Sequence, residues 1–306
     1  MASLIVLLGS LSYIMILAVI NGSVGFLCAM GVTLFGAVGI AKALGETIAL
    51  SYAFIVGLAI LCGVLRGVLR YFEQYSNHYI AFRLLAVLRD KIFSALRLLC
   101  PAKLESKQKG SIIAMITSDI ETLEVFYAHT ISPICIAVLV SFCVVAFVGT
   151  VSSWWLALVA FLGFVTVGVV VPIISSRRLN AYFLDSIKGI KDIVLNNAGR
   201  ERAIEVNRRT DILLDETKKM KRDITKAFAA TELCVSLFIF AALVTGIMLV
   251  MSGELTAGRM IIGVVAVFGS FGPVIAISAL PGNLTQTFAS GERVLNLLSE
   301  RPAVTP

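Results

Sequence analysis

The chain has 306 residues and a net charge of +7, with 58% apolar residues by the AVILMFWYC count and only 15% charged residues. Soluble domains carry about 25% charged residues, so this chain has too little polar surface to cover an exterior that faces water. The composition excludes a soluble globular protein and a disordered chain, and it predicts that lipid surrounds much of the molecule.

Long uncharged stretches alternate with two strongly basic blocks. Of the 26 Lys and Arg residues, nine lie in 66–109 and thirteen in 177–226. By the positive-inside rule both blocks are expected to be cytoplasmic. The breaks near 42–46, 151–154 and 252–256 are short and nearly uncharged, as in tight extracytoplasmic turns. This alternation predicts an all-α membrane protein with both termini in the cytoplasm and six transmembrane helices, at about 11–41, 48–66, 130–151, 154–175, 228–251 and 257–280.

The basic blocks are expected to be helices rather than loops. No proline interrupts 51–99, and Pro101 is the first signal that would end a helix there. A helix of roughly 50 residues rises about 75 Å, more than twice the roughly 30 Å thickness of the hydrocarbon layer. The same interpretation applies to 110–151 and 205–251. The sequence thus predicts two long cytoplasmic helical hairpins, with tips near 101–110 and 196–202.

The stretch from residue 66 to residue 133 resembles the C-type subunit of the CydDC thiol exporters, which are heterodimeric ABC exporters tied to cytochrome bd assembly. The positions that carry the resemblance are Arg66, Arg70, Tyr71, Glu73, His78, Phe82, Arg83, Leu85, Arg89, Pro101, Leu104, Gly110, Asp119, Leu123 and Pro133. The segments LDSIKGIKDIVLNNAGRE and TQTFASGERVLNLL are similar to the transmembrane domain of ABC exporters in general.

This resemblance implies an ABC exporter transmembrane domain over 1–300, followed by the start of a linker at 301–306. It implies a bacterial plasma membrane location, a second exporter half as hetero- or homodimer partner, and nucleotide-binding domains that use ATP. The expected substrate is a small thiol such as cysteine or glutathione. Membrane lipid is an expected partner, and nucleic acid is not.

Two departures from the family pattern are visible. No GxxxxGK[ST] motif occurs, so we expect that this chain alone cannot hydrolyse ATP. The fourth helix, after Trp155, is shorter than the family pattern by about three turns, with the gap near 178–180. We interpret the gap as omitted residues rather than as a truly short helix.

Four polar residues of the second helix, Arg66, Arg70, Glu73 and Asn77, fall within roughly 60° of one another on a helical wheel. Charges near lipid are costly, so this stripe is expected to face a water-filled substrate cavity. The alternative is an ion pair that only locks helix packing. Facing a cavity, the guanidinium groups would attract a substrate that carries carboxylates.

The opposite side of the same helix groups Tyr71, Tyr75, His78 and Phe82. The family resemblance implies a haem b, for which His78 would be the axial iron ligand and the aromatic rings the flat contacts. The alternative is a histidine that is hydrogen-bonded to a neighbouring helix.

The resemblance also implies that short coupling helices at the hairpin tips dock on the nucleotide-binding domains. The residues expected to make this contact are Lys103, Leu104, Glu105, Asn196, Asn197 and Arg200. Binding of these basic tips to anionic lipid headgroups is the alternative.

The function expected from these features is ATP-driven export of a small thiol or related anionic compound by alternating access. One alternative is a lipid, drug or peptide exporter of the same fold. Another is an ion-coupled secondary transporter, but Glu232 is the only acidic residue well inside a late span, and it lies near the cytoplasmic end. A haem sensor that transports nothing is a further alternative.

Overall fold

The computed structural model describes residues 9–99, 115–174, 199–278 and 280–300. In these ranges the chain is helical with short turns and contains no strand. The elements in chain order are η1 (Gly9–Leu11), α2 (Ser12–Ala43), α3 (Tyr52–Leu99), η2 (Met115–Asp119), α6 (Ile120–Phe126), η3 (Tyr127–Ile131), α7 (Ser132–Val151), α8 (Trp154–Val165), η4 (Thr166–Val170), α10 (Gly199–Met251), α11 (Ala257–Gly269), α12 (Gly272–Ser278) and α13 (Leu280–Ser299).

Six helical segments are long and apolar enough to cross a membrane, as the sequence predicts. They are Ser12–Ala43, Tyr52–Leu99, Thr117–Val151, Trp154–Ile174, Thr217–Met251 and Ala257–Ser278. Each overlaps all or most of one of the six predicted spans. The all-α membrane fold is therefore confirmed.

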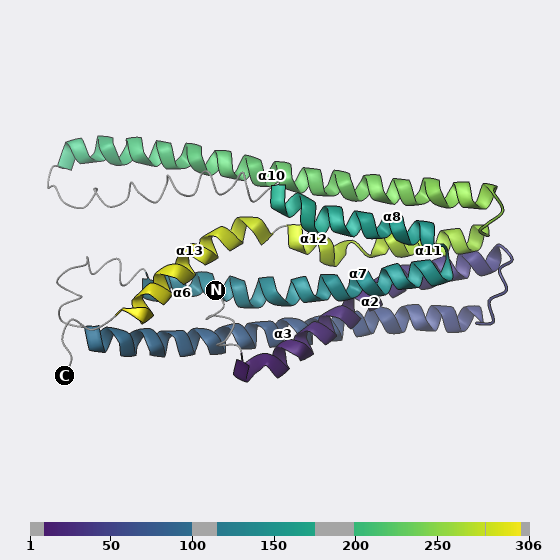
Figure 1. Cartoon of the computed structure of the whole chain (residues 1–306), viewed down its shortest axis with the longest axis horizontal. Coiled ribbons are helices and arrows are strands. Elements are labelled where there is room, and N and C mark those ends of the chain that lie inside the picture. Colours follow the sequence, from purple (N-terminus) through teal and green to yellow (C-terminus); the bar gives the residue numbers. More distant parts are fainter. Residues whose placement is uncertain (1–8, 100–114, 175–198, 279, 301–306) are drawn as a thin grey trace.

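The two longest helices extend far beyond the length that a bilayer requires. Helix α3 has 48 residues and α10 has 53, which corresponds to about 72 Å and 80 Å at 1.5 Å per residue. Both reach the same end of the molecule, here called the hairpin end, where Leu99 and Gly199 lie (Figure 1). The predicted tips at 101–110 and 196–198 lie outside the described residues, as does the gap near 178–180.

Three tight turns at the opposite end, here called the turn end, connect the spans where the sequence predicts them (Figure 1). Gly45 and Gly253 have φ angles of 97° and 77°, a left-handed conformation that residues with a Cβ adopt at a cost. The Ser153 hydroxyl accepts a hydrogen bond from the Trp155 N–H at 3.2 Å and caps α8. Thr256 caps α11 by accepting from the Arg259 N–H at 3.3 Å.

The last span, predicted over 257–280, is interrupted in the structure. Helix α11 ends at Gly269 and α12 begins at Gly272. Pro273 explains the break, because its ring has no N–H to donate and would clash with the carbonyl group of Gly269 four residues earlier. Between the two helices, Phe271 is buried, and its ring centroid lies 5.1 Å from that of Phe164.

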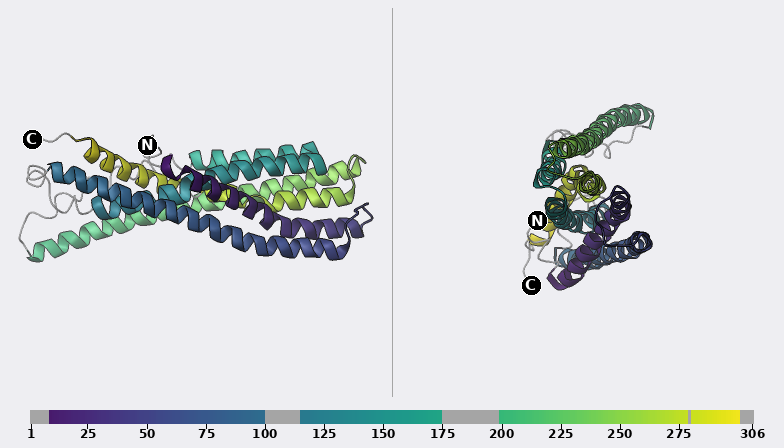
Figure 2. Two further views of the ribbon diagram at one scale, coloured as in Figure 1. Left: turned by 90° about the horizontal axis from the view of Figure 1, so that it is seen from below. Right: turned by 90° about the vertical axis from the view of Figure 1, so that its right-hand side faces the viewer.

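The helices of the bundle approach one another closely at small residues. A Cβ atom added to Gly163 would lie 3.0 Å from side-chain atoms of both Phe238 and Phe271, so this part of α8 packs closely against α10 and against the break between α11 and α12. Viewed from the turn end, α10 and α8 lie on one side of the bundle, and α2 with α3 lies on the other (Figure 2). The candidate site lies where α3, α2, α7 and α12 meet.

Candidate functional site

A cavity of about 320 Å³ lies among the helices, close to the point where α3 leaves its long uncharged stretch. It is lined by residues of α2, α3, η3, α7, α12 and α13: Phe26, Arg70, Glu73, Gln74, Asn77, Ala128, His129, Pro133, Ile136, Pro273, Ala276 and Leu280. Most of its polar groups come from α3, because Arg70, Glu73 and Asn77 recur every three or four residues on one helix face.

An ion pair forms one side of this cavity. The Nη1 group of Arg70 donates hydrogen bonds to both carboxylate oxygens of Glu73, at 2.8 Å to Oε1 and 2.7 Å to Oε2. The Glu73 side chain is only 4% exposed, whereas that of Arg70 is 52% exposed. Helix α2 covers the acid directly, since a Cβ atom added to Gly22 would lie 3.0 Å from Glu73 Cδ. The buried negative charge is therefore compensated by an arginine that still presents other N–H groups.

Asn77, which lines the same cavity, has an unpaired hydrogen-bond acceptor. The residue is 2% exposed, and its buried Oδ1 atom has no hydrogen-bond partner among the described residues. An unsatisfied buried polar atom is costly unless a ligand or water pairs with it. Because Asn77 lines the cavity, a ligand with an N–H or O–H donor would remove this cost.

The predicted polar stripe is thus brought together in part. Arg70, Glu73 and Asn77 line the cavity, whereas Arg66 is exposed and does not line it. Sequence reasoning missed the lining residues from other helices. The contributions of His129 and Ala276 depend on how η3 and α12 pack against α3, which no local pattern reveals.

The His78 region differs from the predicted haem groove. The His78 ring stacks on Phe82 with a centroid distance of 5.9 Å and meets His129 edge to face at 5.5 Å. Its Nδ1 atom lies 3.4 Å from Glu124 Oε1, but the geometry does not form a hydrogen bond.

The tyrosines expected beside the haem form an exposed ladder on the surface of α3. The rings of Tyr71 and Tyr75 stack with centroids 6.2 Å apart, and Tyr75 stacks on Tyr79 at 6.5 Å. All three are exposed, and His78 does not line the candidate cavity beside Asn77. The exposed tyrosine rings therefore do not enclose a porphyrin beside His78.

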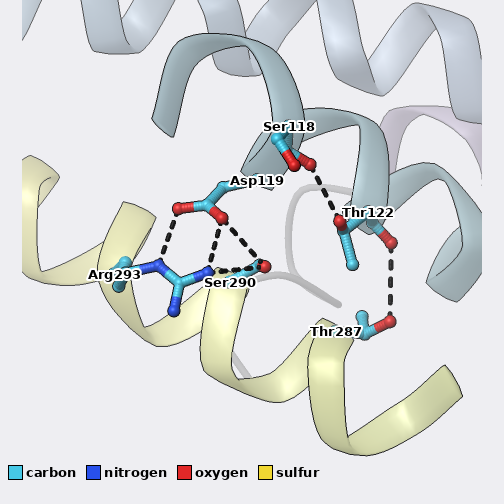
Figure 3. A network of polar contacts seen from close by, with 6 residues as sticks. All are labelled: Ser118, Asp119, Thr122, Thr287, Ser290 and Arg293. Carbon is cyan, nitrogen blue, oxygen red and sulfur yellow. Dashed lines mark hydrogen bonds and ion pairs between the residues drawn. The ribbon is translucent and has the colours of Figure 1, made fainter. Parts of the chain in front are cut away.

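A second polar network joins the hairpin-end helices and was not predicted as a site. Asp119 is the last residue of η2, and it accepts hydrogen bonds from Arg293 and Ser290 of α13 (Figure 3). The distances are 2.7 Å from Arg293 Nε to Oδ2 and 3.1 Å from Ser290 Oγ to Oδ1. The hydrogen bond from Arg293 to Asp119 raises the pKa of the guanidinium above its usual value, so the arginine stays charged.

The predicted coupling residues cannot be placed in the fold. Lys103, Leu104, Glu105, Asn196 and Asn197 lie outside the described residues. Arg200 belongs to the first turn of α10.

Comparison with known proteins identifies related chains. Residues 11–181 match the family described as ABC transporter transmembrane region. A "Probable ABC transporter ATP-binding/permease protein" from Haemophilus influenzae is 41% identical over 316 residues, covering 99% of this chain and 57% of the relative. The chain thus spans little more than half the length of this relative.

Two further relatives are more distant or match a shorter stretch. The "Glutathione/L-cysteine transport system ATP-binding/permease protein CydC" of Haemophilus influenzae is 35% identical over 75 residues, which is 24% of this chain and 13% of the relative. The "ATP-dependent lipid A-core flippase" of Bordetella pertussis is 23% identical over 263 residues, which is 81% of this chain and 41% of the relative.

Proposed function

This chain belongs to the ABC transporter transmembrane region family, and from that premise we propose that it forms one transmembrane half of an ATP-driven exporter in a bacterial plasma membrane. Two halves would alternate between inward-open and outward-open states around a shared pathway. ATP would be hydrolysed on nucleotide-binding domains, consistent with the name of the Haemophilus influenzae ATP-binding/permease relative.

The proposed orientation places the hairpin end and both termini in the cytoplasm. Two basic blocks hold most of the Lys and Arg residues, and the positive-inside rule assigns such blocks to the cytoplasm. Helices α3 and α10 extend toward that side, where they would transmit motion from the nucleotide-binding domains. We assign this contact to Lys103, Leu104, Glu105, Asn196, Asn197 and Arg200, as the family resemblance implies.

The cavity beside Asn77 supports a small polar substrate. A purely anionic ligand would meet an arginine whose charge is already paired with buried Glu73. A ligand with both a carboxylate and an N–H donor suits the site better, because the carboxylate can bind Arg70 while the donor pairs with Asn77 Oδ1 or Glu73. This unpaired Oδ1 atom is the observation that carries the proposal.

Cysteine and glutathione have both kinds of group, and we propose such a thiol compound as the substrate. The local similarity to CydC proteins of Haemophilus influenzae and Escherichia coli supports this choice. A lipid exporter of the same fold is the second candidate, favoured by similarity to a lipid A-core flippase over 81% of the chain. The Asn77 amide in the cavity disfavours an acyl chain there, because an apolar group offers its unpaired Oδ1 atom no hydrogen bond.

The surroundings of His78 do not fit haem b in this chain. His78 could supply an axial nitrogen, but the exposed tyrosine ladder does not enclose it. No transport step is therefore assigned to haem.

The test is ATPase stimulation of the complete transporter by glutathione, with glutarate as an anion that lacks N–H donors. In Arg70→Gln the half-stimulating glutathione concentration should rise about 10- to 150-fold, because a charge-assisted hydrogen bond contributes about 1.5–3 kcal/mol. Arg66→Gln is the matched control, since Arg66 lies on the same helix but outside the cavity. Equal stimulation by glutarate, or equal effects of the two substitutions, would contradict the proposed site.

A further inference from the structure

An apolar surface groove of about 570 Å³ runs between α2 and α3 near the turn end. Its walls include Val32, Gly36, Gly39 and Ile40 of α2 together with Ile55 and Ile60 of α3. Gly36 leaves the floor open, because a Cβ atom added there would meet no other atom within 4 Å. Apart from the hydroxyl of Tyr52, the lining side chains carry no polar group.

A second, polar hollow of about 490 Å³ lies at one end of this groove, around the turn that joins α2 to α3. Tyr52 lines both hollows, so they are adjacent. Lys42 extends into the polar hollow and donates hydrogen bonds from Nζ to the carbonyl oxygens of Ile48 and Leu50, at 2.7 Å and 2.8 Å. An ammonium group has three donors, so one N–H of Lys42 is left for a ligand.

Glu46 places a negative charge in the same polar hollow. Its carboxylate has no hydrogen bond or ion pair with any side chain in the described ranges. The hollow therefore presents a cation held by the turn backbone beside a carboxylate that lacks a partner.

The length of the groove matches half of a bilayer. From Val32 to Ala43 the α2 axis rises about 16 Å at 1.5 Å per residue, and half of the roughly 30 Å hydrocarbon layer is about 15 Å. Both α2 and α3 are membrane spans, so the groove faces the acyl chains of one leaflet while the polar hollow lies at headgroup level.

We propose that the two hollows form one site for an aminophospholipid such as phosphatidylethanolamine. One acyl chain would lie along the groove, the phosphate would accept a hydrogen bond from Lys42, and the primary ammonium would donate to Glu46. Phosphatidylcholine lacks the N–H donors for the last contact, and phosphatidylglycerol lacks the positive charge. This lipid site shares no lining residue with the substrate cavity, so it is independent of the transported compound.

Native mass spectrometry of the complete transporter tests the proposal. The protein would be equilibrated with vesicles of equal parts phosphatidylethanolamine, phosphatidylcholine and phosphatidylglycerol before gentle release into detergent. Wild type should retain phosphatidylethanolamine in preference to the other two. Gly36→Leu fills the groove and should lower the retained lipid about fivefold or more, in line with the burial lost by one leucine-sized group.

Gly57→Leu is the matched control, since Gly57 also has open space around it but does not line the groove. Glu46→Gln should keep the bound acyl chain and reduce the preference for phosphatidylethanolamine over phosphatidylcholine about two- to fivefold, as expected for an ion pair near the surface. Equal lipid retention in Gly36→Leu and Gly57→Leu would show that the retained lipid is non-specific annular lipid, and the proposed site would be wrong. An unchanged headgroup preference in Glu46→Gln would overturn the proposed headgroup contact, even if Gly36→Leu failed to fold.

Discussion

Arg293 in α13 binds Asp119 at the end of η2 through both Nε and Nη2, and the two residues are 174 positions apart in the sequence. Ser290, one turn earlier in α13, also donates to this carboxylate. The network ties η2, which precedes α6, to α13 (Figure 3). Helix α13 is therefore joined to η2 by a charged contact as well as by packing.

We predict that Arg293→Ala lowers the free energy of unfolding by about 1–2 kcal/mol, because the 12% exposed Asp119 carboxylate loses charged donors. Thermal unfolding in detergent measures the effect. The double variant Asp119→Ala/Arg293→Ala should recover part of the loss, since no buried charge then remains unpaired. If the loss in the double variant equalled the sum of the losses in Asp119→Ala and Arg293→Ala, the contact would contribute no coupling energy.

The close contact of Gly149 with Trp154 predicts a second stability effect. A Cβ atom at Gly149 would lie 2.6 Å from two carbons of the Trp154 indole, so Gly149→Ala should destabilise by about 1–3 kcal/mol through overpacking. Gly57→Ala serves as the control because its Cβ atom meets open space. It should be neutral or slightly stabilising, since alanine restricts the unfolded chain. Equal unfolding temperatures for the two variants would contradict the packing around Trp154.

Local sequence patterns predicted the parts of the structure that depend on one helix alone. The absence of proline before Pro101 predicted the length of α3, and helical periodicity placed Arg70, Glu73 and Asn77 on the face that lines the cavity. The same periodicity also placed Arg66 on that face. A helical wheel shows the direction of a side chain around the axis but not its position along the axis, so it cannot show where a cavity ends.

Features that depend on packing between distant helices were not predictable in this way. The pairing of Asp119 with Arg293 and the arrival of His129 at the cavity arise when separate helices pack. The break before Pro273 has a sequence signal, since proline kinks or interrupts helices. The sequence does not predict whether the helix bends or is fully interrupted, because a proline can cause either.

Cysteine labelling tests the proposed orientation. Cysteines that replace Lys107 or Asn197 should react with a membrane-impermeant maleimide only after the cells are opened. A cysteine in place of Glu254, in the turn before α11, should react in intact cells. The native cysteines require a background in which they are replaced by serine or alanine. Labelling of Lys107→Cys in intact cells would show that the topology is the reverse of the proposed one.

The unpaired Oδ1 atom of Asn77 predicts a conflict between stability and function. Leucine has a similar volume and no buried polar atom, so Asn77→Leu should leave the free energy of unfolding unchanged or raise it by about 1 kcal/mol. Stimulation of the ATPase by glutathione should nevertheless weaken about tenfold or more in apparent affinity, because the substrate loses its acceptor. Natural binding sites often show this opposition between stability and activity.

Ser132 provides the matched control for Asn77. It is fully buried, its Oγ atom also has no hydrogen-bond partner among the described residues, and it does not line the cavity. Ser132→Ala should therefore be neutral or stabilising, as Asn77→Leu should be, but it should leave glutathione stimulation unchanged. Thermal unfolding and ATPase titration on the same preparations separate the two effects. If Asn77→Leu lost stability while its glutathione response stayed intact, Asn77 would belong to helix packing rather than to substrate binding.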